Sequence, residues 1–195
     1  MKPIKTLLTI LFILLLSSPS WSVTLGDLVE RDGLYYEKFT DIPFTGEVTG
    51  AEQGSFKDGN KDDGWVGYHE NGQLYYKGDF KSGNFEGAWV WHWENGQLRE
   101  KGNYMTVVRD YNLKTRIRTG AWVGYHKNGQ LYNKGSYKTG RKEGAWISYW
   151  GNGQLWDKGN YKRGRKEGAW VSYNDHGTVD KEYTGTFKRG KKVSD

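Results

Sequence analysis

The sequence predicts an all-β protein, an antiparallel meander of repeated β-hairpins. A tryptophan and the tetrapeptide Asn-Gly-Gln-Leu recur together in one phase. The tryptophans are Trp65, Trp89, Trp122, Trp146 and Trp170, and the tetrapeptides start at Asn71, Asn95, Asn128 and Asn152. Both series advance by 24 residues except for one step of 33, so one repeat carries a nine-residue insertion. A third motif, Gly-x-(Phe/Tyr)-Lys-x-Gly, recurs five times from Gly54 onward. Self-similarity at a fixed period is the signature of a repeat architecture.

Each repeat has the pattern of two strands and two turns. Residues 88–93 carry an aromatic residue at every second position, which is typical of a strand. Asn95-Gly96 follows, and this pair predicts a two-residue type I′ turn, in which both central residues need a positive φ. Residues 97–104 form the return strand, and in the preceding repeat the return strand ends at a second turn, Lys81-Ser82-Gly83. A period of 24 residues therefore fits one hairpin per repeat.

Side-chain alternation divides each strand into two faces. Leu74, Tyr76, Gly78 and Phe80 are predicted to share one face, and Tyr75 with the neighbouring charged residues the other. Glycine normally weakens a strand interior. Its recurrence predicts that rings of neighbouring strands lie over bare backbone at Gly67, Gly78, Gly124, Gly135 and Gly159.

The N-terminus has the pattern of a secretory signal peptide. Lys2 and Lys5 precede an apolar run over residues 7–16, and small residues follow at Ser20 and Ser22. The run is short for a membrane-spanning helix, which needs about 20 apolar residues. We expect residues 1–22 to be removed and the protein to be periplasmic or secreted. Removal lowers the net charge from +6 to 27 − 23 = +4.

The mature chain divides into three predicted parts. Residues 23–52 form an N-terminal capping hairpin, and residues 184–195 a C-terminal cap or tail. The 24-residue repeats occupy residues 53–183, with the insertion at about 105–114.

The repeat units resemble MORN-variant repeats. The resemblance rests on residues 70–81, Glu-Asn-Gly-Gln-Leu-Tyr-Tyr-Lys-Gly-Asp-Phe-Lys, and 87–90, Gly-Ala-Trp-Val. The order of these elements, and the segments 28–36 and 43–46, resemble the YwqK-type antitoxins over about residues 28–190. The resemblance implies an elongated single-layer meander and association with a protein or a membrane. For an antitoxin it implies neutralising a toxic protein by binding it.

The sequence argues against catalysis, metals and cofactors. Cysteine is absent, which excludes disulfides and thiolate sites. His69 and His126 occupy the same repeat position, where other repeats carry Trp93 and Trp150, so a structural role is predicted. Residues 185–192 approach a phosphate-binding loop but lack its final Ser or Thr, and their spacing is that of the repeat turn. We expect a non-catalytic binding protein.

Basic and aromatic residues are the candidate partner contacts. The insertion and the residues after it supply five candidates, and the return strands supply three aromatic ones; these are Arg109, Tyr111, Lys114, Arg116, Arg118, Tyr75, Tyr132 and Trp156. Further basic residues are expected to line one edge as a positive stripe, namely Lys138, Arg141, Lys142, Lys162, Arg163, Arg165, Lys166, Lys188, Arg189, Lys191 and Lys192.

Several functions fit these candidates. The basic stripe either keeps the sheet edge soluble or attracts an acidic protein, an anionic lipid or a cell-wall polymer. The aromatic residues suit a protein interface or a glycan. Nucleic acid is not expected as a partner of an exported chain, and homodimerisation through a terminal strand stays open.

Overall fold

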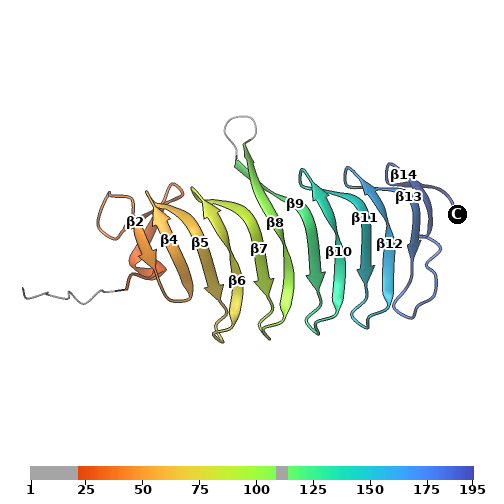
Figure 1. Ribbon diagram of the computed structural model, residues 1–195, viewed down its shortest axis with the longest axis horizontal. Coiled ribbons are helices and arrows are strands. Elements are labelled where there is room, and N and C mark those ends of the chain that lie inside the picture. Colours follow the sequence, from red (N-terminus) through yellow and green to blue (C-terminus); the bar gives the residue numbers. More distant parts are fainter. Residues whose placement is uncertain (1–21, 109–113) are drawn as a thin grey trace, which may run out of the picture.

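The computed structural model describes residues 22–108 and 114–195, which form one long sheet of 13 strands and a small sheet of two (Figure 1). The strands of the long sheet lie side by side in chain order, each antiparallel to its neighbours. The predicted all-β meander of hairpins is therefore confirmed. All of the predicted signal peptide except Ser22 lies outside the described residues.

The strands of the repeats are eight to twelve residues long, and those at the two ends are shorter. The small sheet contains β1 (Leu28–Arg31) and β2 (Leu34–Glu37), after the 3-10 turn η1 (Leu25–Asp27). The long sheet contains β3 (Gly46–Val48), β4 (Glu52–Lys57), β5 (Asn60–Tyr68), β6 (Leu74–Lys81), β7 (Asn84–His92), β8 (Leu98–Val108), β9 (Lys114–Tyr125), β10 (Leu131–Lys138), β11 (Arg141–Tyr149), β12 (Leu155–Lys162), β13 (Arg165–Ser172), β14 (Gly185–Lys188) and β15 (Lys191–Ser194).

The insertion lengthens one hairpin. Met105 pairs with Ile117 and Val108 with Lys114, so the inserted residues on both sides continue the ladder between β8 and β9. This hairpin extends beyond the edge formed by the other repeats (Figure 1). Residues 109–113 lie outside the described part of the chain.

The two edges of the sheet use different turns, and the prediction for Asn-Gly was wrong. The two-residue type I′ turns are at the other edge, where Ser82 and Gly83 both have positive φ, 47° and 75°. In the Asn95-Gly96 pair, Gly96 has a positive φ, 80°, but Asn95 does not. There the Gly96 N–H donates to the Trp93 carbonyl and the Trp93 N–H to the Gln97 carbonyl, which closes a three-residue loop. Asn95 instead links two repeats, because its side-chain amide donates to the Lys127 carbonyl of the next turn at 2.7 Å.

The same edge explains why histidine and tryptophan alternate at one repeat position. His69 Nε2 lies 3.0 Å from the His92 carbonyl oxygen, and Trp93 Nε1 donates to the Tyr125 carbonyl at 3.1 Å. Each ring thus links its repeat to the backbone of the next, and either side chain supplies the ring nitrogen. The predicted structural role of His69 and His126 is confirmed, since His126 contacts the Tyr149 carbonyl in the same way.

A bulge at the start of each return strand changes the predicted faces. Tyr68 pairs with Leu74 and Gly67 with Tyr76, so Tyr75 is an extra residue in the ladder. A bulge re-aims the side chain at that position. The Tyr75 ring consequently lies 5.6 Å from the Tyr76 ring, and placing it on the opposite face was wrong.

Each repeat tryptophan lies over a glycine of the preceding strand. A Cβ atom at Gly78, Gly135 or Gly159 would overlap the ring of Trp89, Trp146 or Trp170. These predictions are confirmed, as is that for Gly67, which lies under the Tyr76 ring. The prediction is wrong for Gly124: the Tyr132 ring comes no closer than 3.7 Å to the Cβ position, which is an ordinary contact. Sequence reasoning missed Gly54 and Gly102, which lie under Trp65 and Trp122.

The N-terminal end of the sheet is covered by the small sheet and the segment after it. The rings of Tyr35 and Phe44 pack on Phe56, with centroid distances of 4.8 and 5.8 Å. Backbone hydrogen bonds join Tyr35 and Phe44 to Gly59 in the turn between β4 and β5.

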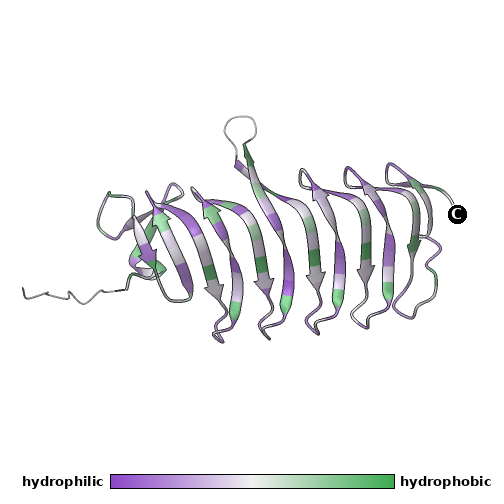
Figure 2. Cartoon of the chain, viewed as in Figure 1, coloured by the Kyte–Doolittle hydropathy of each residue, from purple (hydrophilic) through white to green (hydrophobic). Residues whose placement is uncertain are grey.

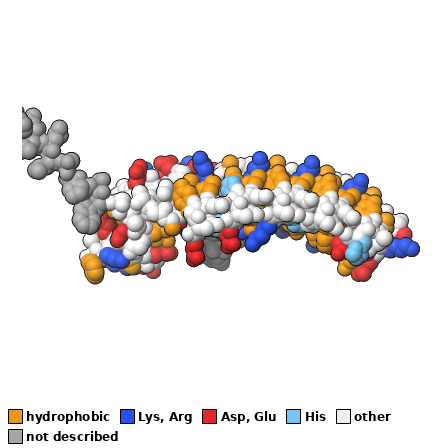
Figure 3. Space-filling model, turned by 90° about the horizontal axis from the view of Figure 1, so that it is seen from below, with side chains coloured by type: hydrophobic (Ala, Val, Ile, Leu, Met, Phe, Trp, Pro, Cys, Tyr) orange, Lys and Arg blue, Asp and Glu red, His pale blue; other side chains and the backbone are white. Residues whose placement is uncertain are grey.

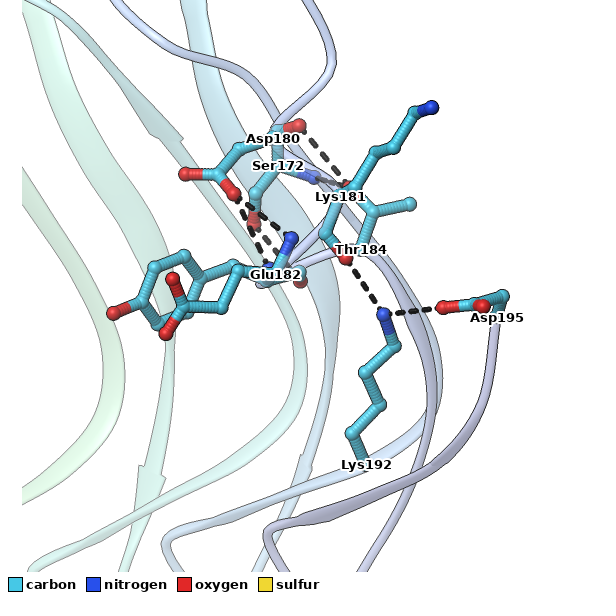
Figure 4. A network of polar contacts seen from close by, with 8 residues as sticks. Ser172, Asp180, Lys181, Glu182, Thr184, Lys192 and Asp195 are labelled. Atoms are coloured by element: carbon cyan, nitrogen blue, oxygen red, sulfur yellow. Dashed lines mark hydrogen bonds and ion pairs between the residues drawn. The ribbon is translucent and has the colours of Figure 1, made fainter.

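The C-terminal end is held by a polar network around β13 (Figure 4). The Ser172 N–H donates to Thr184 Oγ1 at 2.9 Å, and the Lys192 ammonium donates to the Lys181 carbonyl at 2.6 Å. Lys192 also forms an ion pair with Asp195 at 2.6 Å. These contacts fix the loop before β14 against the end of the array.

We predict that Gly135→Ala destabilises the protein by about 1–3 kcal/mol, because the added methyl group overlaps the Trp146 ring and the core is already filled. Urea unfolding measures the change. Gly64→Ala is the matched control, since the nearest atom to its Cβ position is Asp79 Oδ1 at 3.6 Å. Equal stabilities of the two variants would contradict the role given to Gly135.

Candidate functional site

One face of the sheet carries a continuous layer of aromatic rings, named here the aromatic face. Trp65 and Trp89 are each only 1% exposed, although the 13 strands of the long sheet form a single layer. Successive rings pack edge to face, as between Tyr104 and Trp122, whose centroids are 5.0 Å apart. The buried indole N–H groups donate to backbone carbonyls, for example Trp170 Nε1 to Asn160 at 2.9 Å. Hydrophobic residues recur along successive strands rather than gathering in one interior (Figure 2).

Cationic side chains cover these rings. In four repeats the residue four positions before the tryptophan is Lys or Arg, with its charged group above the indole ring. The distances from the charged group to the nearer ring centroid are 4.0 Å for Lys61, 4.2 Å for Arg118, 4.2 Å for Lys142 and 4.3 Å for Lys166. A cation over an aromatic face is stabilised by the ring quadrupole, and its alkyl stem excludes water.

The predicted positive stripe therefore has two parts with different roles. Lys142 and Lys166 lie over tryptophan rings, and burial lowers the pKa of both side chains. Placing these two residues on the exposed edge was wrong. The residues around the type I′ turns, such as Arg141, Arg163 and Arg189, are exposed.

The second repeat departs from the pattern at two positions. Phe85 stands where the other repeats carry the covering cation, and it stacks on Trp89 at 4.0 Å. Trp91 stands where the other repeats carry Gly67, Gly124, Ser148 and Ser172. Arg116 of the lengthened hairpin lies over Phe85, 4.1 Å from the ring centroid, and replaces the missing cation.

These departures surround a hollow of about 620 Å³ on the aromatic face, named here the aromatic hollow. It extends from β1 to β9, and its lining includes Glu30, Tyr35, Glu52, Lys61, Tyr75, Tyr76, Phe85, Trp91, Arg99, Glu100, Tyr104, Arg116 and Arg118. It therefore joins the N-terminal cap to the lengthened hairpin.

The charges in the hollow are partly paired. Lys61 forms an ion pair with Glu52 at 2.6 Å, and Arg118 with Glu100 at 3.0 Å. Arg99 and Arg116 have no ion-pair partner among the described residues and lie over aromatic rings. The hollow thus offers aromatic surface and two guanidinium groups that form no ion pair with any described residue.

The predicted contact residues do not form one site. Tyr75, Arg116 and Arg118 line the aromatic hollow, whereas Lys114 is exposed at the start of β9. Tyr132 and Trp156 stack on one another, with centroids 6.4 Å apart, nearer the C-terminal end. Arg109 and Tyr111 lie outside the described residues.

Sequence reasoning missed Trp91, Arg99 and the three carboxylates of the hollow, Glu30, Glu52 and Glu100. A signal for Trp91 was present, because aligning the repeats shows one large ring at a position otherwise occupied by Gly or Ser. Nothing comparable marks Glu52, whose place beside Lys61 depends on the pairing of β4 with β5.

The described residues contain no group of three or more His, Asp or Glu side chains that could hold a metal ion. The Arg189-Gly190 pair of the segment resembling a phosphate-binding loop forms the turn between β14 and β15. No helix within residues 22–108 and 114–195 has the length and apolar character needed to cross a membrane.

This architecture defines a linear array of β-hairpins in a single layer, in which each repeat packs on its neighbours. A family model described as MORN repeat variant matches residues 65–82, 85–105, 118–139 and 142–163, so the chain contains MORN-variant repeats. No curated protein matches the chain. The ring-over-glycine contacts of Trp65 and Trp170 show that the repeat geometry continues outside the matched residues, to β4 and β13. Repeats of this family are generally non-catalytic.

We predict that the Tyr76→Phe variant loses less of its free energy of unfolding at high pH than the unmodified protein does. Burial, with the nearby Glu52 carboxylate, raises the pKa of Tyr76 well above its ordinary value of 10. Above pH 10 the unfolded tyrosine loses its proton while the folded one keeps it, so stability falls as pH rises. Between pH 9.5 and 11 the variant should lose about 1 kcal/mol less than the unmodified protein, measured by urea unfolding. Equal losses would contradict the assignment.

Proposed function

We propose that this protein is an exported scaffold that binds another protein in the aromatic hollow and acts as an antitoxin or immunity-like partner. The MORN-variant repeats support a binding scaffold. The N-terminal leader and the resemblance to YwqK-type antitoxins support the rest of the proposal.

The observation that carries the proposal is the departure of the second repeat from the pattern of the others. A repeat selected only to fold would keep Gly or Ser at the position of Trp91, as four other repeats do. Instead, a half-buried tryptophan lines the hollow together with two guanidinium groups without ion-pair partners among the described residues. Tryptophan, tyrosine and arginine are the residues that most often dominate the binding energy of protein interfaces.

The test is a pull-down with residues 23–195 as bait against an envelope extract of the producing organism, at low and high salt. We expect one stoichiometric protein at both salts. Trp91→Ser, which copies the residue of the later repeats, should reduce its recovery at least tenfold. Trp156→Ser is the control, because Trp156 is half-buried but lies outside the hollow.

Three outcomes would count against the proposal. Loss of the partner with Trp156→Ser and not with Trp91→Ser would move the site to the C-terminal rings. Recovery of only lipid or wall polymer would remove the protein partner. A recovered protein that has no toxic activity in the absence of this chain would remove the antitoxin role.

A second function, association with an anionic envelope surface, is favoured by the exposed cations around the type I′ turns. Three successive turns present them on one edge: Lys138, Arg141, Lys162, Arg163, Arg165, Lys188, Arg189 and Lys191. Such a row attracts anionic lipid or cell-wall polymer over a distance that salt screens.

We predict that Arg163→Glu combined with Arg189→Glu abolishes any co-sedimentation with phosphatidylglycerol vesicles at about 0.05 M salt. The unmodified protein should bind at low salt and lose binding at about 0.5 M. Binding that resists both the substitutions and the salt would exclude this edge as the contact.

A further inference from the structure

The face opposite the aromatic layer carries a straight row of alternating aliphatic and lysine side chains. Val90 pairs with Lys101, Lys101 with Val123, and Val123 with Lys134 across successive strands. The row continues through every strand from β5 to β13: Val66, Lys77, Val90, Lys101, Val123, Lys134, Ile147, Lys158 and Val171. Because the strands lie side by side in one layer, this row follows the long axis of the molecule (Figure 1).

The row lies in an open groove of about 990 Å³, named here the reverse groove. Exposed alanines at Ala88, Ala121, Ala145 and Ala169 line it beside the row. Their small side chains leave space above the sheet. Basic side chains recur at intervals among hydrophobic ones on the surface of the arched body (Figure 3).

The groove is positively charged without compensation. Lys101, Lys134 and Lys158 are in its lining, and no Asp or Glu among the described residues is. None of the three has an ion-pair partner within the described part of the chain, and all are exposed. Charge complementarity therefore calls for an acidic occupant that also has apolar side chains for Val90, Val123 and Ile147.

The spacing of the row selects the conformation of that occupant. Adjacent strands are about 4.8 Å apart, so residues in the row alternate every ~4.8 Å and lysines recur every ~10 Å. In an α-helix, residues i and i+7 are about 10.5 Å apart on one face, with i+3 and i+4 between them. In an extended strand, side chains on one face recur every ~6.7 Å, which does not match the ~10 Å spacing of the lysines. In a polyproline helix, side chains on one face recur every ~9.3 Å, but no side chain lies halfway between them to contact the aliphatic residues of the row.

The geometry points to the reverse groove as a docking site for an amphipathic, acidic α-helix of a partner protein. Its acidic residues recur every seven positions and meet the lysines, and its apolar residues at the intervening three or four positions meet the valines and Ile147. From Val90 to Val171 the groove spans six strand intervals, about 29 Å, which a helix of about 19 residues covers. This surface is on the opposite face from the aromatic hollow and is independent of the function proposed for it.

The probe is a synthetic, fluorescein-labelled 21-residue peptide with Leu at one heptad position and Glu four positions later, the rest being Ala, Gln and Ser. Fluorescence anisotropy measures its affinity for residues 23–195, and circular dichroism its helicity. We expect saturable binding with a gain of helix. A peptide of the same composition, with each Glu moved to the opposite helix face, should bind at least tenfold more weakly.

Two matched protein variants distinguish a specific contribution of the lysines in the row from a non-specific effect of net charge. The triple variant Lys101→Glu, Lys134→Glu and Lys158→Glu should weaken peptide binding at least tenfold. Lys81→Glu, Lys138→Glu and Lys162→Glu change the net charge equally on exposed residues outside the groove lining and should change binding less than twofold. If the first triple variant fails to unfold cooperatively, Lys134→Gln alone replaces it, with a smaller loss expected. Trp91→Ser should leave peptide binding unchanged.

Four results would overturn the proposal. These are equal affinity for the two peptides, equal loss with the two triple variants, binding without helix formation, and binding only to vesicles of phosphatidylglycerol and phosphatidylcholine. If vesicle binding is lost on substitution of Lys101, Lys134 and Lys158, the row would be assigned to a lipid surface instead.

Discussion

The structure depends on the contact between a tryptophan ring and the bare backbone of a glycine in the preceding strand. A single-layer sheet has no second layer in which to bury large side chains, so its rings must lie flat on the sheet itself. The absence of a Cβ at Gly78 or Gly135 lets the ring of Trp89 or Trp146 descend into van der Waals contact with the strand. The usual cost of glycine in a strand is offset by the apolar area that the ring then buries.

Rings on one face of an open sheet would still be in contact with water. In four repeats, the lysine or arginine four residues before the tryptophan covers the ring and reduces this contact. This arrangement divides the cations of one chain into two groups with different environments. Lys142 and Lys166 belong to the fold because they lie over tryptophans, whereas Lys134 and Lys158 point away from them into the reverse groove. The second repeat differs from the others in these contacts. Phe85, in place of a covering cation, and Trp91, in place of a small residue, both line the aromatic hollow, and Arg116 of the lengthened hairpin lies over Phe85.

The periodicity of the sequence predicted much of the fold but less of the aromatic hollow. The period of 24 residues and the glycines within strands were sufficient to predict the hairpin meander and the rings over Gly78, Gly135 and Gly159. The turn at Asn95-Gly96 was predicted wrongly because a local preference for type I′ yields to the hydrogen bond that Asn95 makes with the next turn. Tyr75 was placed on the wrong face because alternation holds only in a regular ladder, and a bulge interrupts it.

The sequence by itself determined the all-β class, the 24-residue hairpin repeat and the position of the insertion, because these depend on motifs that repeat along the chain. Only the tertiary structure decided which cations cover the aromatic rings and which are exposed. Lys142 and Arg141 are adjacent in sequence and equally basic, yet one lies over Trp146 and the other is exposed at the edge. That difference arises because neighbouring residues of a strand point to opposite faces, and bulges and strand pairing determine what each face meets.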